Sequence, residues 1–386
     1  MSNPYLHLAA PGVRGLKPYL PGKPISELER EYGVTNIIKL ASNENPLGPG
    51  KRVLEALRDI PDGELSRYPD GGGFELKQAL ARRHGVGPEC ITLGNGSNDV
   101  LVMIAEAFLQ DSLEAIHSQY AFAVYPIAIQ AVGATACVAP ALPADSDSPY
   151  GHDLTAMAGL ISERTRLVFI ANPNNPTGTW VRSEPLRTFV EELPPQALVV
   201  IDQAYSEYMD DPEYPDCVDW LDRFPNLIVT HTFSKAFGLA GLRIGYAVSA
   251  PGIAEILDRI RQPFNVNVMA NVAALAALED RQHLAHSIEM NAAERDRVQT
   301  ALASFGLQCV PSAGNFVLAD MGQPALPIYD SLLRNSVIVR PVANYGLDRH
   351  LRISIGTPPE NDRLLQALGV VLDATSGAAG ELGDGD

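Results

Sequence analysis

The sequence has 386 residues, 46% of them hydrophobic, and a formal net charge of −17, from 29 lysines and arginines against 46 aspartates and glutamates. This strong negative charge argues against nucleic acid or an anionic membrane surface as the main partner. The length predicts one large domain and a smaller one, with enough core to bury a cofactor.

The four cysteines are far apart and form no CxxC pair, so the sequence predicts neither a zinc site nor a disulfide framework. The first 22 residues lack the charged start and apolar core of a signal peptide. No stretch is long and apolar enough to cross a membrane. We therefore expect a soluble cytoplasmic protein that binds no metal.

The chain begins with two dozen residues rich in proline and glycine, a composition that favours an arm laid over a surface or a partner. We expect residues 1–44 to form this arm and part of a small domain.

Residues 45–265 alternate short apolar runs with helical patterns, and we expect them to form a large cofactor-binding domain. The runs are CITLG, RLVFIA, ALVVID, NLIVTHT and RIGYAV. Continuous apolar strands separated by helices indicate an α/β fold, with a mostly parallel sheet covered by helices on both faces. Ligands of such sheets bind at the carboxyl ends of the strands.

Residues 266–375 differ in pattern and are predicted to form a smaller α+β domain. A long helical stretch is followed by the strand-like runs NFVLAD, SVIVRPV and HLRISIG and by a final helix. This order of elements is typical of a separate domain. Residues 376–386 are expected to be a flexible tail.

Polar corners follow four of the apolar runs. In the first, GNGSND, the glycines allow close backbone approach and Ser97 or Asn98 can cap the next helix, whose free amides favour an anion such as phosphate. Ordinary turn chemistry explains the same residues equally well.

The second corner, NPNNPTG, has two Asn-Pro pairs that restrict the backbone, so Asn175 would lose little entropy on binding; a capped turn is the alternative. In the third, VVIDQAYSEY, Asp202 ends a run that should be buried. Its carboxylate is expected to face a cation, with Tyr205 in the same pocket, although a helix N-cap aspartate would give the same pattern.

The fourth corner, THTFSKAFGLAGLRIGY, places Lys235 among small, hydroxylated and apolar residues. A lysine with a lowered pKa in such a setting can act as an amine nucleophile, while Thr232, Ser234 and Arg243 suit a phosphate. Most lysines are solvated surface charges, so the residue alone decides nothing.

Together the four corners require a single ligand. It carries a phosphate, a cationic ring nitrogen opposite Asp202, an oxygen near Asn175 and Tyr205, and a carbonyl carbon near Lys235. Pyridoxal 5′-phosphate has all of these groups.

The segments NPNNPTG, IDQAYSEY and TFSKAFGLAGLRIGY, in this order and spacing, resemble the pyridoxal-phosphate-dependent aminotransferases of fold type I. The resemblance runs from about Tyr19 to Leu368. KLASNENPLGP, SRYPDGG, ITLGNGSND, VIVRPV and LRISIGT are more similar to the histidinol-phosphate aminotransferase family. This resemblance implies a homodimer and ping-pong transamination between L-histidinol phosphate and 2-oxoglutarate, giving imidazole-acetol phosphate and glutamate, a step of histidine biosynthesis.

The resemblance also implies roles for individual residues. Lys235 would be the catalytic lysine that binds the cofactor covalently, and Asp202 would pair with its protonated ring nitrogen. Tyr205 and Asn175 would hydrogen-bond the ring oxygen, and Phe122 would stack on the ring. The cofactor phosphate would be bound by Ser97, Asn98, Thr232, Ser234 and Arg243, and by Tyr68 of a second subunit.

For the substrates, Arg352 resembles the residue that binds the α-carboxylate in this class, because the planar guanidinium suits bidentate binding; a surface salt bridge is the alternative. Histidinol phosphate has no carboxylate, so Arg352 should meet that group only in glutamate. Arg340, Tyr19 and Asn98 resemble the residues that bind the substrate phosphate. Asn45 would line the entrance of the same substrate site.

Three alternatives stay open. An aromatic-amino-acid aminotransferase, acting on phenylalanine or tyrosine, would need a similar site, since imidazole and phenyl side chains are similar in size. A threonine-phosphate decarboxylase of related sequence is the second alternative. A non-catalytic cofactor-binding regulator is the third, although the chain shows neither a basic patch nor a DNA-binding segment.

Overall fold

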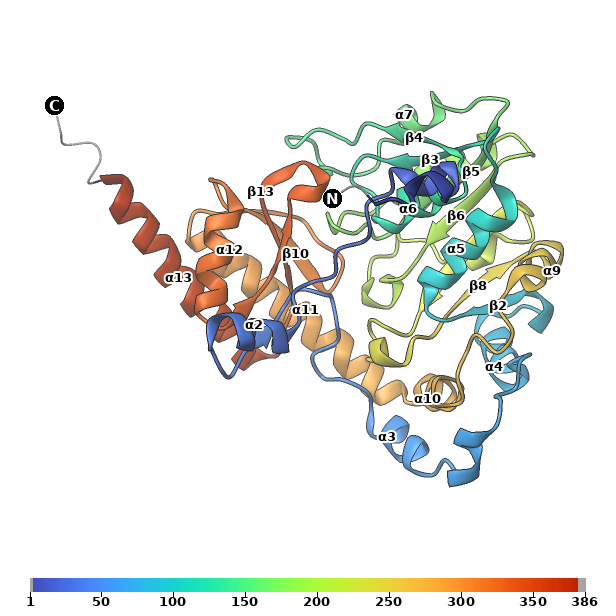
Figure 1. Ribbon diagram of the computed structural model, residues 1–386, viewed down its shortest axis with the longest axis horizontal. Helices are drawn as coiled ribbons and strands as arrows, with labels where there is room; N and C mark the ends of the chain where they lie inside the picture. The colour runs from blue at the N-terminus through green and yellow to red at the C-terminus, as the bar shows by residue number, and fades with distance from the viewer. Residues whose placement is uncertain (1–2, 381–386) are drawn as a thin grey trace.

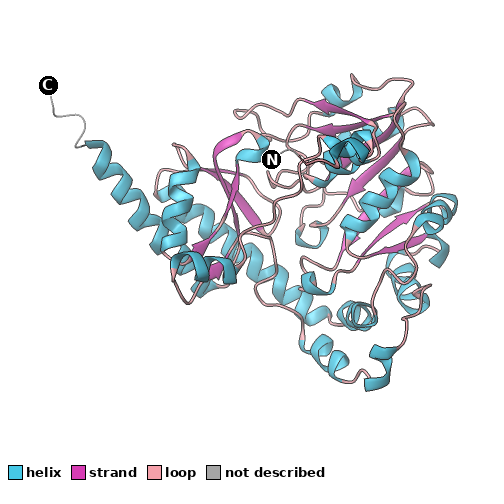
Figure 2. Cartoon of the chain, viewed as in Figure 1, coloured by secondary structure: helices cyan, strands magenta, loops and turns pink. Residues whose placement is uncertain are grey.

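A computed structural model describes residues 3–380 of the chain. It has two lobes (Figure 1), a larger one built on a sheet with β2 and β4 at its edges and a smaller one that carries α12 and α13. Strands lie inside each lobe, and helices cover them on the outside (Figure 2).

The sheet of the larger lobe has seven strands in the order β2-β8-β7-β6-β5-β3-β4. Their bounds are β2 Ile91–Gly94, β3 Glu114–Ser118, β4 Thr135–Ala139, β5 Thr165–Ala171, β6 Leu198–Asp202, β7 Leu227–Thr232 and β8 Gly245–Ser249. The five neighbouring strands β4, β3, β5, β6 and β7 pair in parallel. Strand β8 runs antiparallel to both β7 and β2.

Both faces of this sheet are buried. On one face Leu167 and Phe169 pack with side chains of α5, α6 and α9; on the other, Val168 and Ile170 pack with side chains of α4, α8 and α10. The helices are α4 Phe74–His84, α5 Ser97–Phe108, α6 Val124–Ala131, α8 Ser183–Glu192, α9 Pro251–Ile260 and α10 Val268–Glu279. The predicted α/β fold, a mostly parallel sheet covered on both faces, is confirmed.

The smaller lobe contains an antiparallel sheet in the order β12-β13-β10-β9 and a parallel pair, β1 with β11. The strands are β1 Ile38–Lys39, β9 Gln308–Val310, β10 Phe316–Asp320, β11 Val337–Ile338, β12 Arg340–Val342 and β13 Leu347–Ser354. Its helices are α2 Ile25–Tyr32, α11 Arg281–Ser304, α12 Ala325–Arg334 and α13 Pro358–Gly380. The predicted smaller α+β unit is therefore present.

The predicted boundary between the two domains lies between residues 265 and 266. In the structure, the chain passes from the core of the larger lobe to that of the smaller lobe only after α10. Val266 and Ala270 belong to the core of the larger lobe, whereas Val298 and Leu302 of α11 belong to that of the smaller lobe. We therefore propose a boundary within α11. Helix α13 continues through residues 376–380, which were expected to be a tail; residues 381–386 of that tail lie outside the described residues.

Three shorter helices complete the larger lobe: α1 Pro11–Arg14, α3 Lys51–Arg58 and α7 Leu154–Ala158. Helix α1 belongs to the N-terminal arm and lies against α6 (Figure 1). Gln130 of α6 donates to the Gly12 carbonyl over 3.1 Å, and a Cβ atom on Gly12 would collide with the Gln130 carbonyl oxygen. The arm is thus laid over the surface of the larger lobe.

Within residues 3–380, no helix is both long and apolar enough to cross a membrane. In the same range, no three His, Cys, Asp or Glu side chains gather in a way that could hold a metal ion.

Glu207 is a half-buried acid in the 3-10 helix η4 (Ser206–Tyr208). It lines a cavity together with Arg83, His84 and His231. Its Oε2 atom is buried and has no hydrogen-bond partner among the described residues. Because an ionised carboxylate loses its hydration there, burial raises the pKa of Glu207 from 4.5 to about 7.

We expect Glu207→Gln to remove part of the pH dependence of stability of the ligand-free protein. The folded protein binds the Glu207 proton more tightly than the unfolded chain, so this stabilisation is complete below about pH 4.5 and is lost as the pH rises through about 7. Its size is at most about 3 kcal/mol, and smaller in proportion to the partial exposure of Glu207.

Urea unfolding at several pH values between about 5 and 8 measures this difference. Glu191→Gln is the matched control, because Glu191 forms an exposed ion pair with Arg223. If Glu207→Gln and the natural sequence gave parallel stability profiles, the assignment of this pH dependence to Glu207 would be wrong.

Candidate active site

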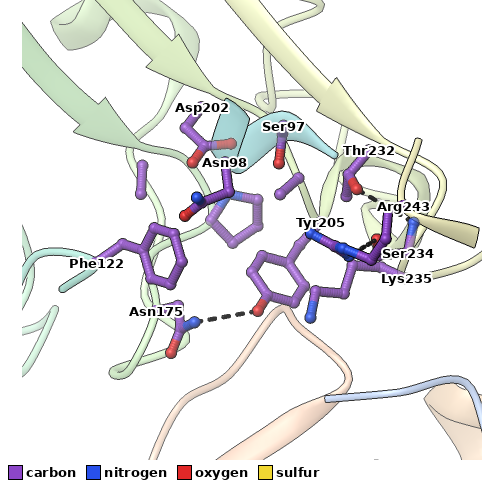
Figure 3. A pocket seen from close by; sticks show the side chains of 13 residues that line it. Ser97, Asn98, Phe122, Asn175, Asp202, Tyr205, Thr232, Ser234, Lys235 and Arg243 are labelled. Carbon is purple, nitrogen blue, oxygen red and sulfur yellow. Dashed lines mark hydrogen bonds between the residues drawn. The ribbon is translucent and has the colours of Figure 1, made fainter. Parts of the chain in front are cut away.

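A pocket lies at the carboxyl ends of β5, β6 and β7 and at the start of α5 (Figure 3). Every predicted cofactor-binding residue except Tyr68 lines it. The lining residues are Ser97, Asn98, Phe122, Ala171, Pro173, Asn175, Asp202, Ala204, Tyr205, Thr232, Ser234, Lys235 and Arg243. The parallel sheet brings these separate sequence segments to one place, as expected for strands that end at the same edge.

One end of the pocket is built to receive an anion. Helix α5 begins at Ser97, and its N-cap, Gly96, has no side chain to bond the free amides of the first turn. A Cβ atom on Gly96 would lie 2.5 Å from Arg243 Nη2, and one on Gly245 would collide with the Ser97 nitrogen. Glycine at both positions therefore keeps these donors close to any bound group.

Hydroxyl and guanidinium groups complete the anion-binding end. Thr232 ends β7, and its Oγ1 accepts from the Ser234 amide over 3.1 Å. Arg243 Nη1 lies 3.5 Å from Ser234 Oγ and donates to the Ala240 carbonyl over 3.1 Å. Figure 3 shows Thr232, Ser234 and Arg243 on the same side of the pocket as Lys235. This donor set suits a phosphate.

Asp202 lies at the end of β6 and is only 5% exposed. Tyr125 donates its hydroxyl proton to Asp202 Oδ2 over 2.9 Å, and Thr230 donates to Oδ1 over 3.0 Å. Burial raises the pKa of Asp202, while these two hydrogen bonds and the Lys235 charge act in the opposite direction. The carboxylate is thus poised for a cationic partner.

The hydroxyl oxygen of Tyr205 accepts two hydrogen bonds. Asn43 Nδ2 donates over 2.9 Å and Asn175 Nδ2 over 3.3 Å. Asn43 adopts a left-handed backbone conformation with φ of 54°, and its side chain is held by Ser354. With two donors on its oxygen, Tyr205 can direct its own O–H into the pocket.

Only one asparagine of the NPNNPTG corner lines the pocket. Asn172 exchanges two hydrogen bonds with the backbone of Val181, and Asn174 donates to the Tyr120 carbonyl and to Thr177. These contacts hold the turn together and leave Asn175 at the pocket wall.

Lys235 follows β7 and is partly buried. Its Nζ lies 5.5 Å from the centre of the Tyr205 ring and 3.4 Å from the Ser42 carbonyl oxygen. Burial, and then the Arg352 charge, lower the pKa of Lys235 from 10.5 to about 8. About a tenth of such amines are neutral at pH 7, compared with about one in 3,000 for an ordinary lysine.

Arg352 reaches the pocket region from β13 of the smaller lobe and is 7% exposed, so the alternative of a surface salt bridge is excluded. Its Nη1 donates to Asn175 Oδ1 over 2.6 Å and its Nη2 to the Ala41 carbonyl over 2.7 Å. Its Nε is buried without a partner among the described residues. Guanidinium N–H groups therefore remain for a ligand carboxylate.

Tyr19 of the arm and Arg340 of β12 lie together in a neighbouring cavity. The Arg340 guanidinium lies 5.9 Å from the centre of the Tyr19 ring and donates to the Leu20 carbonyl over 2.5 Å. Ala123, next to Phe122, also lines this cavity.

Tyr68 and Asn45 line neither the pocket nor the neighbouring cavity. Tyr68 is 81% exposed and stacks on Phe264 with ring centres 4.5 Å apart. Asn45 Nδ2 donates to the Ala236 carbonyl and to Ser287 Oγ, over 2.8 and 3.0 Å. The Asn45 amide is thus engaged inside the protein, next to Lys235, and a role of Asn45 in binding substrate stays a prediction.

The sequence interpretation missed Tyr125 and Thr230, which both contact Asp202. For each of them, the spacing from a predicted site residue could have indicated a place near the site. Thr230 is two residues before Thr232 on β7, so both side chains are on one face of the strand. Tyr125 is three residues after Phe122, in the first turn of α6, and the two rings are in contact.

Residues 35–368 match the family of aminotransferases of class I and II. The chain is 54% identical over 374 residues to histidinol-phosphate aminotransferase 2 of Pseudomonas fluorescens strain Pf-5, covering 96% of this chain and 99% of the relative. It is also 54% identical over 365 residues to histidinol-phosphate aminotransferase 2 of Methylococcus capsulatus, covering 95% and 98%. The crystal structure of histidinol-phosphate aminotransferase from Sinorhizobium meliloti in complex with pyridoxal-5′-phosphate matches with a TM-score of 0.86 and 33% identity, covering 95% of this chain and 97% of that one.

Proposed function

Because the chain belongs to the histidinol-phosphate aminotransferases of the class I and II aminotransferase family, we propose that it transfers the amino group of L-histidinol phosphate to 2-oxoglutarate. The products are imidazole-acetol phosphate and glutamate, and the reaction belongs to histidine biosynthesis. The observation that carries this proposal is the identity of about half of all residues over nearly the full length of relatives with this activity in their names.

Pyridoxal 5′-phosphate is the cofactor, and the residues of the pocket fit it. Its phosphate would be bound by the start of α5 together with Ser97, Asn98, Thr232, Ser234 and Arg243. The cofactor ring nitrogen requires a buried acid, and Asp202 is such an acid. Tyr205 and Asn175 offer hydrogen-bond donors to the ring oxygen. When bound, the cofactor supplies an electron sink that stabilises negative charge at the substrate Cα.

Lys235 would act at two points of the reaction. Its amine binds the cofactor covalently when no substrate is present, which requires a neutral nitrogen, and the lowered pKa provides one. Once the substrate amine has replaced it, the same nitrogen removes the proton from the substrate Cα. Asp202 would stabilise a proton at the ring nitrogen, and Phe122 would stack on the ring.

Substrate recognition is assigned to residues of the smaller lobe and the arm. Arg352 would bind the α-carboxylate of glutamate or 2-oxoglutarate through N–H groups that no neighbour uses. Arg340, with Tyr19 and Asn98, would bind the phosphate of histidinol phosphate. Arg340 has the positive charge that a dianion needs, in a chain with a net charge of −17.

We also propose that the protein works in the cytoplasm as a homodimer. Tyr68 is 81% exposed, and three further apolar side chains are exposed as well: Phe264, which stacks on Tyr68, and Leu65 and Phe74, which are near it in the sequence. A second copy of the chain would cover this surface and would bring Tyr68 to the phosphate-binding end of its neighbour's pocket.

The proposal is tested by comparing kcat/KM for L-histidinol phosphate and phenylalanine, with 2-oxoglutarate as the acceptor. We expect histidinol phosphate to be preferred by about 10²-fold or more, because a charge-assisted contact to its phosphate is missing for phenylalanine. Histidinol without phosphate is the control that separates the phosphate from the imidazole. A preference for phenylalanine would identify an aromatic-amino-acid aminotransferase instead, and release of CO₂ from threonine phosphate would identify the decarboxylase.

A further inference from the structure

Asp202 is held by two hydroxyl groups that do not line the pocket. We propose that Tyr125, together with Thr230, is a positioning residue that keeps the Asp202 carboxylate ionised and correctly oriented, and thereby sets the affinity for the cofactor ring nitrogen. This inference rests on the proposed function, since it takes Asp202 as the partner of that nitrogen.

The position of the Tyr125 hydroxyl is fixed by packing. Tyr125 is completely buried in α6. Its ring stacks on Phe169 of β5, with centres 4.9 Å apart and planes at 14°, and meets the edge of Phe122 at 5.8 Å and 87°. Because the Tyr125 ring packs against both of these rings, its hydroxyl is directed at Asp202 Oδ2 at little entropic cost.

The electrostatic need for this contact follows from the burial of Asp202. A carboxyl group that is almost completely removed from water tends to take up a proton, and a neutral acid would pair poorly with a pyridinium nitrogen. Hydroxyl donors favour the ionised form, and here each carboxylate oxygen receives one. Lys235 is the nearby cation that acts in the same direction, but its charge is lost when its amine reacts. Tyr125 and Thr230 keep their effect throughout.

Tyr125 also connects two parts of the proposed cofactor site. Phe122, which lines the pocket, is in contact with the same ring whose hydroxyl bonds Asp202. Phe122, just before α6, and Tyr125, in its first turn, therefore place both the stacking residue and the support of the acid. Tyr125→Phe retains the aromatic contacts and deletes only the hydroxyl, so it separates packing from hydrogen bonding.

The test measures equilibrium binding of two ligands to the cofactor-free protein. One is pyridoxal 5′-phosphate, and the other is its carbocyclic analogue, in which C–H replaces the ring nitrogen. For Tyr125→Phe we expect the Kd of pyridoxal 5′-phosphate to rise about tenfold, which is the size of one hydrogen bond to a charged group. The Kd of the analogue should stay nearly unchanged, because it offers Asp202 no charge.

Tyr246→Phe is the matched control. Tyr246 is also buried, but its hydroxyl bonds His84 Nε2 over 2.8 Å in a different cavity, so its loss should leave both Kd values unchanged. A second readout is the ¹⁵N chemical shift of bound, ring-labelled pyridoxal 5′-phosphate, which should move toward that of an unprotonated nitrogen in Tyr125→Phe. If Tyr125→Phe does not fold, Thr230→Val, which keeps the side-chain shape, should give the same selective weakening.

The inference is overturned if Tyr125→Phe raises the Kd of both ligands equally, because lost packing would then be the cause. It is also overturned if neither Kd changes. Failure of the proposed function has a different signature, because the natural sequence itself would then fail to bind pyridoxal 5′-phosphate.

Discussion

Replacement of Lys235 by alanine should abolish covalent cofactor binding and lower the rate of transamination by about 10⁴-fold, the upper range for the loss of a positioned proton-transfer group. The phosphate-binding donors and Asp202 are untouched, so the cofactor should still bind without a covalent bond. Denaturing filtration followed by absorption spectroscopy distinguishes the two forms of binding. Lys51→Ala, which removes an exposed lysine on α3, is the control and should retain both covalent binding and activity.

A small primary amine added to the Lys235→Ala protein should restore part of the proton transfer, because the pocket retains its other groups. Cofactor that remains covalently attached in the Lys235→Ala protein would refute the assignment of Lys235 and would point to a different lysine.

Replacement of Arg352 by lysine should affect the two half-reactions unequally. We expect kcat/KM with glutamate to fall by about 10²-fold, because lysine keeps the charge but cannot form the two parallel hydrogen bonds that a carboxylate accepts from arginine. The half-reaction with histidinol phosphate, which has no carboxylate, should fall much less. Some loss in both is expected, since Arg352 also bonds Asn175 and the Ala41 carbonyl.

Single-turnover rates with each donor measure this ratio directly. Arg349→Lys is a suitable control: Arg349 lies on the same strand, but it pairs with Asp320 at the surface. Equal losses for glutamate and histidinol phosphate would mean that Arg352 only supports the structure.

The strands at the centre of the large sheet could be predicted because they are buried on both faces. β5, β6 and β7 are nearly continuous apolar runs for this reason. β3 and β4 were not predicted as strands. β3 includes Glu114 and His117, and β4 lies at the edge of the sheet, where most of its side chains are at least partly exposed. An edge strand needs less apolar surface, so its pattern is weaker.

The site could be predicted where a polar residue ends a buried strand or comes within three residues of its end, since the topology of the sheet then determines its place. Asp202 and Lys235 are of this kind. Asn45 lies in an equally suggestive motif, but the direction of its side chain depends on Ala236 and Ser287, which are distant in the sequence. The predicted role of Tyr68 depends on a second chain, which no pattern within one chain can place.

The boundary that we propose within α11 lies later than the predicted one for a related reason. Helix α10 is rich in alanine and apolar on every side, so its sequence fits either core equally well. Only its packing on α3 and α4 assigns it to the larger lobe.

The origin of the residues proposed for the cofactor and of two arginines proposed for the substrates in different lobes has a practical value for protein engineering. The side chains assigned to the cofactor come from the larger lobe, whereas Arg340 and Arg352, assigned to the substrates, come from strands of the smaller lobe. Amino-donor preference is therefore open to redesign at β12, β13 and the arm while the catalytic machinery is kept. The hydrogen bond between Arg352 and Asn175 joins the two sets, so libraries that vary position 352 should also vary position 175.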